Sequence, residues 1–151
     1  MANRSAGPAP EVAVFFYGSY MNGAVLREIG LTSRRTDVAS LSGFDIEIAP
    51  IANVVPVAGQ MVWGIITTAT HAELDQVYAH ARDVLGRVYL PHAVLVEAAG
   101  GVFRPVLCYI GVPVVPAPAA NDYVDRVVAG AREHGLPAAY IDRLERFRPG
   151  R

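Results

Sequence analysis

The sequence predicts a single domain of the α+β class, and three observations lead to this prediction. Apolar runs rich in β-branched and aromatic residues are typical of buried strands. Segments with helix start and stop signals lie between these runs. A Gly-Gly pair separates two further strand-like runs, which indicates a β-hairpin. The chain has 151 residues, of which 52% are apolar and 18% charged, so it is long enough to bury a core of its own.

The first expected strand is the run 12–17, which is continuously apolar. A central strand covered on both faces has this pattern. The run ends at Gly18, and Asn22 is then placed to cap a short helix over 23–29. Gly30 is a typical stop for that helix. The chain is therefore expected to run from strand to tight loop to short helix.

Two more strands are expected before the second helix. The segment 36–48 alternates, so Ile46 falls on one face and Glu47 on the other. A break follows around Pro50, and the next strand is expected over 61–67.

A second helix is expected to begin at Thr70 and to end near Gly86. Thr70 and Glu73 have the spacing of a capping box, in which each side chain binds the other residue's backbone amide. At 100° per residue, His80 falls outside the apolar stripe. The stripe itself consists of Leu74, Val77, Tyr78, Ala81 and Leu85.

The C-terminal part of the chain predicts a hairpin and two helices. The strand-like runs 87–97 and 102–110 flank the Gly-Gly pair. Prolines then carry the chain off the sheet, and helices are expected over 122–134 and 137–147. Residues 1–10 are expected to form a flexible tail, which leaves 11–151 as the domain.

Composition excludes several classes of function. The net charge is −1, which gives no field to steer nucleic acid or an anionic membrane. All 13 basic residues are arginine, so Schiff-base chemistry on lysine is excluded. The four histidines and Cys108 lack the spacing of a metal motif, so neither metal nor cofactor is expected. No stretch approaches the ~20 apolar residues that span a bilayer. We expect a cytoplasmic protein with a small-molecule partner, and the sequence leaves its oligomeric state open.

The loop Tyr17-Gly18-Ser19-Tyr20 is the most informative local feature. A small-residue bend between a buried strand and a helix leaves backbone amides unpaired, and such amides can hold a carboxylate or an oxyanion. A tight turn without a ligand is the alternative interpretation. The bend is not a nucleophile elbow around Ser19, because Tyr17 and Met21 stand where that motif has glycine.

Four stretches in order resemble the γ-glutamylcyclotransferase-like family. The segment 16–19 resembles its Tyr-Gly-Ser-Asn loop, and 49–56, which includes Asn53, resembles its Ser-Pro-Tyr-Ala-Asn-Ile-Val-Pro segment. The segment 62–65 and the later Leu74-Asp75 resemble its Val-Trp-Gly-Val strand and Leu-Asp helix. The C-terminal residues that match its closing helices are Pro116, Tyr123, Gly130-Ala131, Gly135-Leu136-Pro137 and Tyr140. The resemblance covers nearly the whole chain after Pro10.

The resemblance implies a small mixed β-barrel with surrounding helices and a pocket at the Tyr17–Tyr20 loop. Family enzymes release 5-oxoproline from γ-glutamyl amides without a metal or cofactor. The substrate's α-amine attacks its own γ-carbonyl, loop amides hold the oxyanion, and a glutamate moves protons. By this resemblance the substrate-binding residues are Tyr17, Gly18, Ser19, Tyr20 and Asn53.

The sequence departs from the family at two positions. Counting from Leu74-Asp75, the catalytic glutamate is replaced by Tyr78, and Tyr20 stands where the family has asparagine. A phenol with a pKa of about 10 is a poor base at pH 7, although it can donate a hydrogen bond. Tyr78 is therefore the candidate catalytic donor or a packed core residue. Glu47 is the candidate replacement base or a solvated residue on the barrel exterior.

Three functions follow from these residues. The first is a γ-glutamylcyclotransferase-like enzyme that acts on a small γ-glutamyl amide or a related amino-acid derivative. The second is a diverged cyclase, lyase or tailoring enzyme of a biosynthetic pathway that uses Tyr78 as an acid. The third is a non-catalytic small-molecule binding protein.

Overall fold

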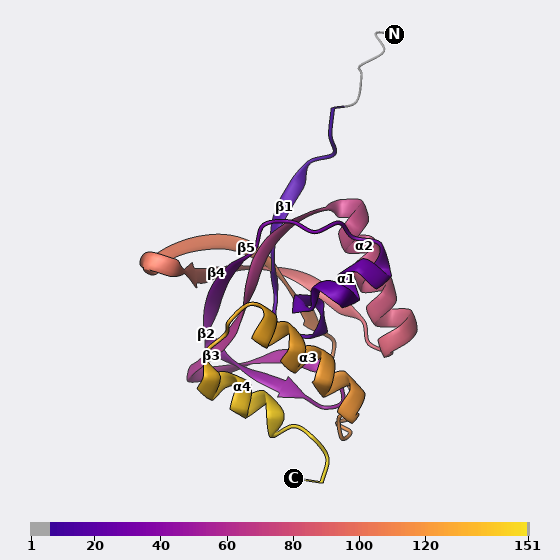
Figure 1. Cartoon of the computed structure of the whole chain (residues 1–151), viewed down its shortest axis with the longest axis vertical. Coiled ribbons are helices and arrows are strands. Elements are labelled where there is room, and N and C mark those ends of the chain that lie inside the picture. The colour runs from indigo at the N-terminus through magenta and orange to yellow at the C-terminus, as the bar shows by residue number, and fades with distance from the viewer. Residues whose placement is uncertain (1–6, 151) are drawn as a thin grey trace.

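The computed structural model describes residues 7–150, and its centre is a five-stranded barrel (Figure 1). The strands follow one another in the hydrogen-bonded order β1-β3-β2-β4-β5, and β5 returns to β1. The β1–β5 pair is parallel and the other pairs are antiparallel. The bounds are β1 Glu11–Phe16, β2 Asp37–Ile48, β3 Ala52–Thr70, β4 Tyr89–Ala98 and β5 Val102–Gly111. The predicted α+β fold with a small mixed barrel is confirmed.

Helices cover the barrel on two sides. In Figure 1, α1 and α2 lie together on one side, and α3 and α4 lie near the C-terminal end of the chain. The bounds are α1 Gly23–Ile29, α2 His71–His80, α3 Asn121–Glu133 and α4 Ala138–Glu145. No helix among residues 7–150 combines the length and the hydropathy that a membrane-spanning helix needs.

Local sequence signals explain both ends of α1 and the start of α2. The Asn22 side chain accepts from the Ala24 amide at 2.9 Å, as its capping position predicts. Thr70 and Glu73 form the predicted capping box: each side chain accepts from the other residue's amide, at 3.1 Å and 2.9 Å. Gly30 ends α1 with φ 102°, a left-handed conformation that favours glycine.

Two expected boundaries are corrected. The strand expected over 61–67 spans Ala52–Thr70, because its first half also pairs with β2. Ala52, Asn53 and Val54 are buried, but residues 56–61 are exposed and include Pro56 and Gly59, which interrupt the strand pattern in the sequence. The second helix is α-helical only to His80 and continues as a π-helical turn over Ala81–Leu85. The expected stripe is still the inner face, since Leu74 and Val77 are buried.

The hairpin is formed as expected. Ala98 pairs with Val102 across a short turn in which Gly100 and Gly101 have φ of 77° and 75°. This hairpin projects from the barrel in Figure 1. Part of the expected tail over 1–10 lies outside the described residues; 7–10 are exposed and precede β1. The division into tail and domain stays a prediction.

Candidate functional site

The chain bends sharply where β1 leaves the barrel. Tyr17 and Gly18 lead into a 3-10 turn over Ser19–Met21, in which the Met21 amide donates to the Gly18 carbonyl at 3.1 Å. Among the described residues, no backbone carbonyl accepts from the amides of Gly18, Ser19 or Tyr20. The Ser19 amide donates to the Tyr123 hydroxyl oxygen. The amides of Gly18 and Tyr20 have no acceptor among the described residues and are available to a ligand.

Position 18 requires glycine because a side chain has no room there, and its backbone angles do not require glycine. A Cβ on Gly18 would lie 2.8 Å from the Cβ of Ala52 and 3.3 Å from the hydroxyl oxygen of Tyr123. The φ of Gly18 is −114°, which any residue adopts. The bend, the start of β3 and helix α3 thus meet at this point.

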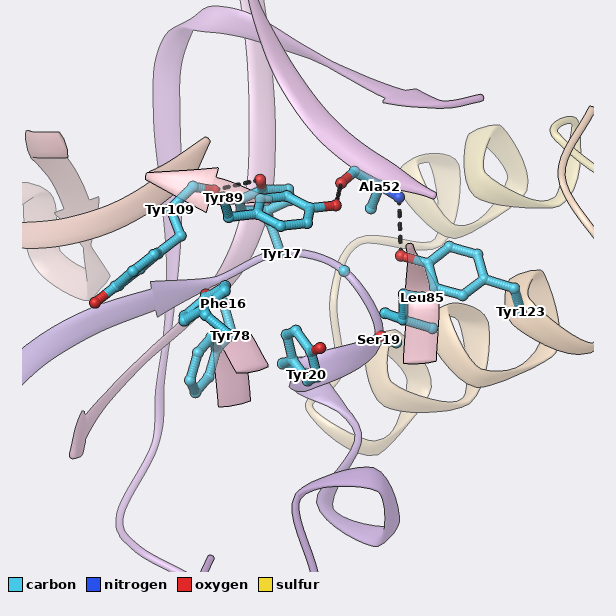
Figure 2. Close-up of a pocket in the computed structure, with 11 residues that line it drawn as sticks. Phe16, Tyr17, Ser19, Tyr20, Ala52, Tyr78, Leu85, Tyr89, Tyr109 and Tyr123 are labelled. Carbon is cyan, nitrogen blue, oxygen red and sulfur yellow. Dashed lines mark hydrogen bonds between the residues drawn. The ribbon is translucent and has the colours of Figure 1, made fainter. Parts of the chain in front are cut away.

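Two tyrosine hydroxyls hydrogen-bond to the backbone of Ala52, one at its amide and one at its carbonyl (Figure 2). Its amide donates to the Tyr123 hydroxyl oxygen at 2.8 Å, and its carbonyl accepts from the Tyr89 hydroxyl. Burial raises the pKa of Tyr123, and hydrogen bonds from Ala52 and Ser19 oppose part of that rise. Residues that are far apart in sequence therefore form one wall beside the bend.

A small hollow, here called the tyrosine pocket, lies between the bend and these residues (Figure 2). Its volume is about 20 Å³, close to that of a single water molecule. The lining residues are Phe16, Tyr17, Gly18, Ser19, Tyr20, Ala52, Tyr78, Leu85, Tyr89, Tyr109 and Tyr123. None of them is acidic or basic, so phenol groups are the main titratable lining. The narrow space agrees with an aromatic residue at position 20.

The phenols remain neutral hydrogen-bond donors at pH 7. Burial raises the pKa of Tyr17, Tyr20, Tyr78 and Tyr89. The Tyr17 hydroxyl donates to the Tyr109 carbonyl at 2.6 Å. Phenolate chemistry is therefore strongly disfavoured here.

Tyr78, which the sequence analysis named as a candidate catalytic donor, lines the tyrosine pocket. Its ring stacks on Tyr109 with centroids 3.7 Å apart and planes 9° apart, and it meets the edge of Tyr20 at 5.7 Å. The Tyr78 hydroxyl has no hydrogen-bond partner within residues 7–150. That hydroxyl is therefore available to a ligand.

His80 is a site neighbour that the helical stripe did not indicate. Its Nδ1 lies 3.0 Å from the Tyr20 hydroxyl oxygen, which is also 3.2 Å from the Val77 carbonyl oxygen. Burial lowers the pKa of His80, and the charge of Arg126 lowers it further. His80 is thus a neutral base at pH 7. A stripe calculated along one helix cannot detect this contact, because Tyr20 belongs to a different segment.

Glu47 and Asn53 lie outside the tyrosine pocket. Asn53 is buried, and its side chain accepts from the Gly111 amide at 2.8 Å, which ties β3 to β5. Glu47 is half-buried and is the cross-strand partner of Asn53. Side chains alternate along β3, so Ala52 faces the pocket while Asn53 and its partner face away. The bend residues Tyr17, Gly18, Ser19 and Tyr20 and the helix residue Tyr78 are brought together, whereas these two are not.

An open groove adjoins the tyrosine pocket. This outer groove has a volume of about 530 Å³ and lies between α2 and the β4–β5 hairpin. Tyr78, Tyr89 and Tyr109 line both spaces, so their rings form the wall between them. A ligand larger than water requires movement of this wall or of Tyr20.

Metal ligands and reactive thiols are not gathered at the site. Within residues 7–150, no group of three or more His, Cys, Asp or Glu residues is arranged to hold a metal ion. Cys108 is buried, and burial raises its pKa to about 12. Hydrogen-bond donors therefore dominate the chemistry available here.

Comparisons with known proteins agree on the fold. The γ-glutamyl cyclotransferase structure is 22% identical over 93% of this chain and 90% of that chain, with a TM-score of 0.81. An uncharacterized protein from Homo sapiens gives the same identity and TM-score over 93% and 89%. A yeast γ-glutamyl cyclotransferase specific to glutathione is 13% identical, covers 93% and 98%, and has a TM-score of 0.60. No curated protein matches the sequence significantly.

At these identities the structural likeness shows the fold alone. Family membership is shown by a sequence model instead: the model of the AIG2-like family matches residues 61–144, more than half of the chain. This range includes Tyr78, Tyr89, Tyr109 and Tyr123. The protein therefore belongs to the AIG2-like family, with a γ-glutamylcyclotransferase-like fold.

Proposed function

We propose that this protein is a cyclotransferase-type enzyme that converts a small γ-glutamyl amide, or a related amino-acid derivative, into a cyclic amide and a free amine. The observation that carries this proposal is the bend at Gly18–Tyr20. Its amides have no backbone acceptor within the described chain, and they lie beside a hollow lined with neutral donors. Preorganised donors of this kind stabilise a developing oxyanion.

The proposed reaction forms one bond and breaks one. The substrate's α-amine nitrogen attacks its own γ-carbonyl carbon, and the bond from that carbon to the leaving nitrogen breaks. The proton that the α-amine loses is delivered to the leaving nitrogen, so no co-reactant is needed. The nucleophile is tethered to the carbonyl, so the protein has to fold the substrate rather than collect two molecules.

Proton transfer needs a donor and an acceptor. The Tyr78 hydroxyl, without a hydrogen-bond partner within residues 7–150, is proposed to donate a hydrogen bond to the oxyanion or the leaving nitrogen while keeping its proton. His80 is the proposed acceptor, reached through the Tyr20 hydroxyl at 3.0 Å. This arrangement is favoured over Glu47, which faces away from the tyrosine pocket. If Tyr78 acts alone as an acid, the same site suits a diverged cyclase or lyase.

The substrate has to displace side chains as it binds. The tyrosine pocket holds about one water, whereas the outer groove measures about 530 Å³. We propose that the rings of Tyr78 and Tyr109 move to join the two spaces, with the leaving group in the outer groove. Movement of such rings gates access in many enzymes.

A non-catalytic binding protein is the second candidate. It is favoured by the absence of any carboxylate from the pocket lining. Loss of a general base costs about 10² to 10⁴ in rate, so a pocket that only binds is chemically consistent. Such a protein would be stabilised by its ligand without forming a product.

The test is release of 5-oxoproline and free amine from a panel of γ-glutamyl amides. We expect wild-type turnover, and a loss with Tyr78→Phe if its hydroxyl takes part. Tyr140→Phe is the matched control, because Tyr140 lies on α4 away from the pocket lining. Tyr78→Glu is expected to raise the rate. Thermal stabilisation by these amides without product would support the binding protein and reject the enzyme.

A further inference from the structure

Arg87 is a buried cation without an anionic partner. The residue is 5% exposed. Its Nε and Nη2 both donate to the Val112 carbonyl oxygen, at 3.2 Å and 3.0 Å. Its Nη1 is buried and has no hydrogen-bond partner, and Arg87 forms no ion pair with any residue of the described chain. Both N–H groups of Nη1 therefore lack an acceptor, and the positive charge lacks an anionic partner.

Such an arrangement is costly for a protein to keep. A buried guanidinium loses its hydration, and buried charges are normally paired or coordinated. The ion-paired arginines of this chain lie nearer the surface; Arg34 and Arg143, for example, have side chains 24% and 31% exposed. An unmatched buried cation therefore points to a partner that the free chain does not contain.

The position of Arg87 connects it with the tyrosine pocket. Its guanidinium carbon lies 5.8 Å from the ring centroid of Tyr89, and Tyr89 lines the pocket. Its charge also acts on Tyr123, another lining residue, by lowering the pKa of that phenol. Gly111 permits the approach, because a Cβ there would lie 2.8 Å from the guanidinium carbon. Arg87 thus lies against Tyr89, one of the residues that form the wall of the pocket with Ala52.

We propose that Arg87 selects ligands with a free carboxylate, which bind in the tyrosine pocket with that carboxylate toward Tyr89 and Tyr123. The ligand class is a small amino-acid derivative that carries an amide and one carboxylate. The proposal rests on the proposed function in taking the tyrosine pocket as the ligand site. It concerns binding, however, and does not require turnover.

The chemistry of the lining explains why this charge matters. The pocket offers backbone amides and phenols, which are neutral donors, and no cation of its own. Neutral donors hold a carboxylate somewhat more strongly than a carbonyl, and a nearby cation adds a charge attraction that only the carboxylate receives. Arg87 acts on the pocket by its charge, across the Tyr89 ring.

The experiment compares 5-oxoproline with its neutral carboxamide, which has the same ring but no charge. Affinity is measured by calorimetry or thermal shift at matched ionic strength, with wild type, Arg87→Met, Arg87→Gln and Arg35→Met. Wild type is expected to prefer 5-oxoproline by about tenfold or more. Arg87→Met and Arg87→Gln are expected to lose most of this preference. Arg35→Met, which removes an exposed positive charge, should keep the preference.

Each result decides the matter. Equal binding by wild type, no binding of either compound, or an undiminished preference in a folded Arg87 variant overturns the proposal. Arg87→Gln covers the case in which Arg87→Met does not fold, because its amide can still donate to Val112. Turnover with an unchanged preference in these variants would reject the role of Arg87 and leave the proposed function standing. Binding that depends on Arg87 but is not followed by turnover would support the role of Arg87 and reject the proposed function.

Discussion

Replacing Gly18 with alanine is expected to destabilise the protein by steric overlap at the bend. The added Cβ would lie 2.8 Å from the Cβ of Ala52 and 3.3 Å from the Tyr123 hydroxyl oxygen. Carbon atoms in favourable contact stay about 3.5–4.0 Å apart, so the backbone has to move. Overpacking of this kind costs about 1–3 kcal/mol. The φ of Gly18 is −114°, so backbone strain adds little.

A double-mutant cycle measured by urea unfolding tests this reasoning. Ala52→Gly removes the overlapping atom and alone costs about 0.5–1 kcal/mol, because glycine weakens a strand. The double variant Gly18→Ala/Ala52→Gly should therefore recover about 1–2 kcal/mol relative to additivity. Combining Gly18→Ala with Ala93→Gly, in an exposed part of β4, is the control and should give additive losses. Wild-type stability of Gly18→Ala, or additivity in the first pair, would refute the close approach.

Three further predictions concern α2 and its contacts. Wild-type stability should fall as the pH drops below about 6.5, because burial lowers the pKa of His80 and the unfolded state then binds the proton more readily. His80→Gln should flatten that part of a stability-against-pH curve. Thr70→Ala should cost about 1 kcal/mol in chemical unfolding, since it removes the cap that Glu73 completes. Tyr20→Asn should cost about 3 kcal/mol yet widen the tyrosine pocket, which ligand-induced thermal shifts would detect as stronger stabilisation by γ-glutamyl amides.

Each of these has an outcome that contradicts it. If wild type and His80→Gln lose stability equally below pH 6.5, protonation of His80 does not destabilise the folded state. A neutral Thr70→Ala variant would mean that the capping box contributes no net stability. Tyr20→Asn protein that is folded but no better stabilised by ligands would show that this ring does not limit access.

Much of the fold is encoded locally. The capping box at Thr70, the cap at Asn22 and the left-handed glycines of the β4–β5 hairpin each depend on residues within a few positions of one another. Propensity and spacing suffice for such features. The first part of β3 was missed because its exposed stretch, residues 56–61, contains Pro56 and Gly59, which are untypical of a strand.

The sequence by itself determined the order of strands and helices, the bend at Tyr17–Tyr20 and the resemblance that placed Tyr78 at the catalytic position. Only the tertiary structure decided which side chains meet that bend. Tyr89 and Tyr123 reach Ala52 from distant elements, His80 reaches Tyr20, and Glu47 turns away. The physical reason is distance along the chain. Helix caps and strand faces depend on residues that are close in sequence. The tyrosine pocket and the unpaired charge of Arg87 arise where closure of the barrel packs distant segments together.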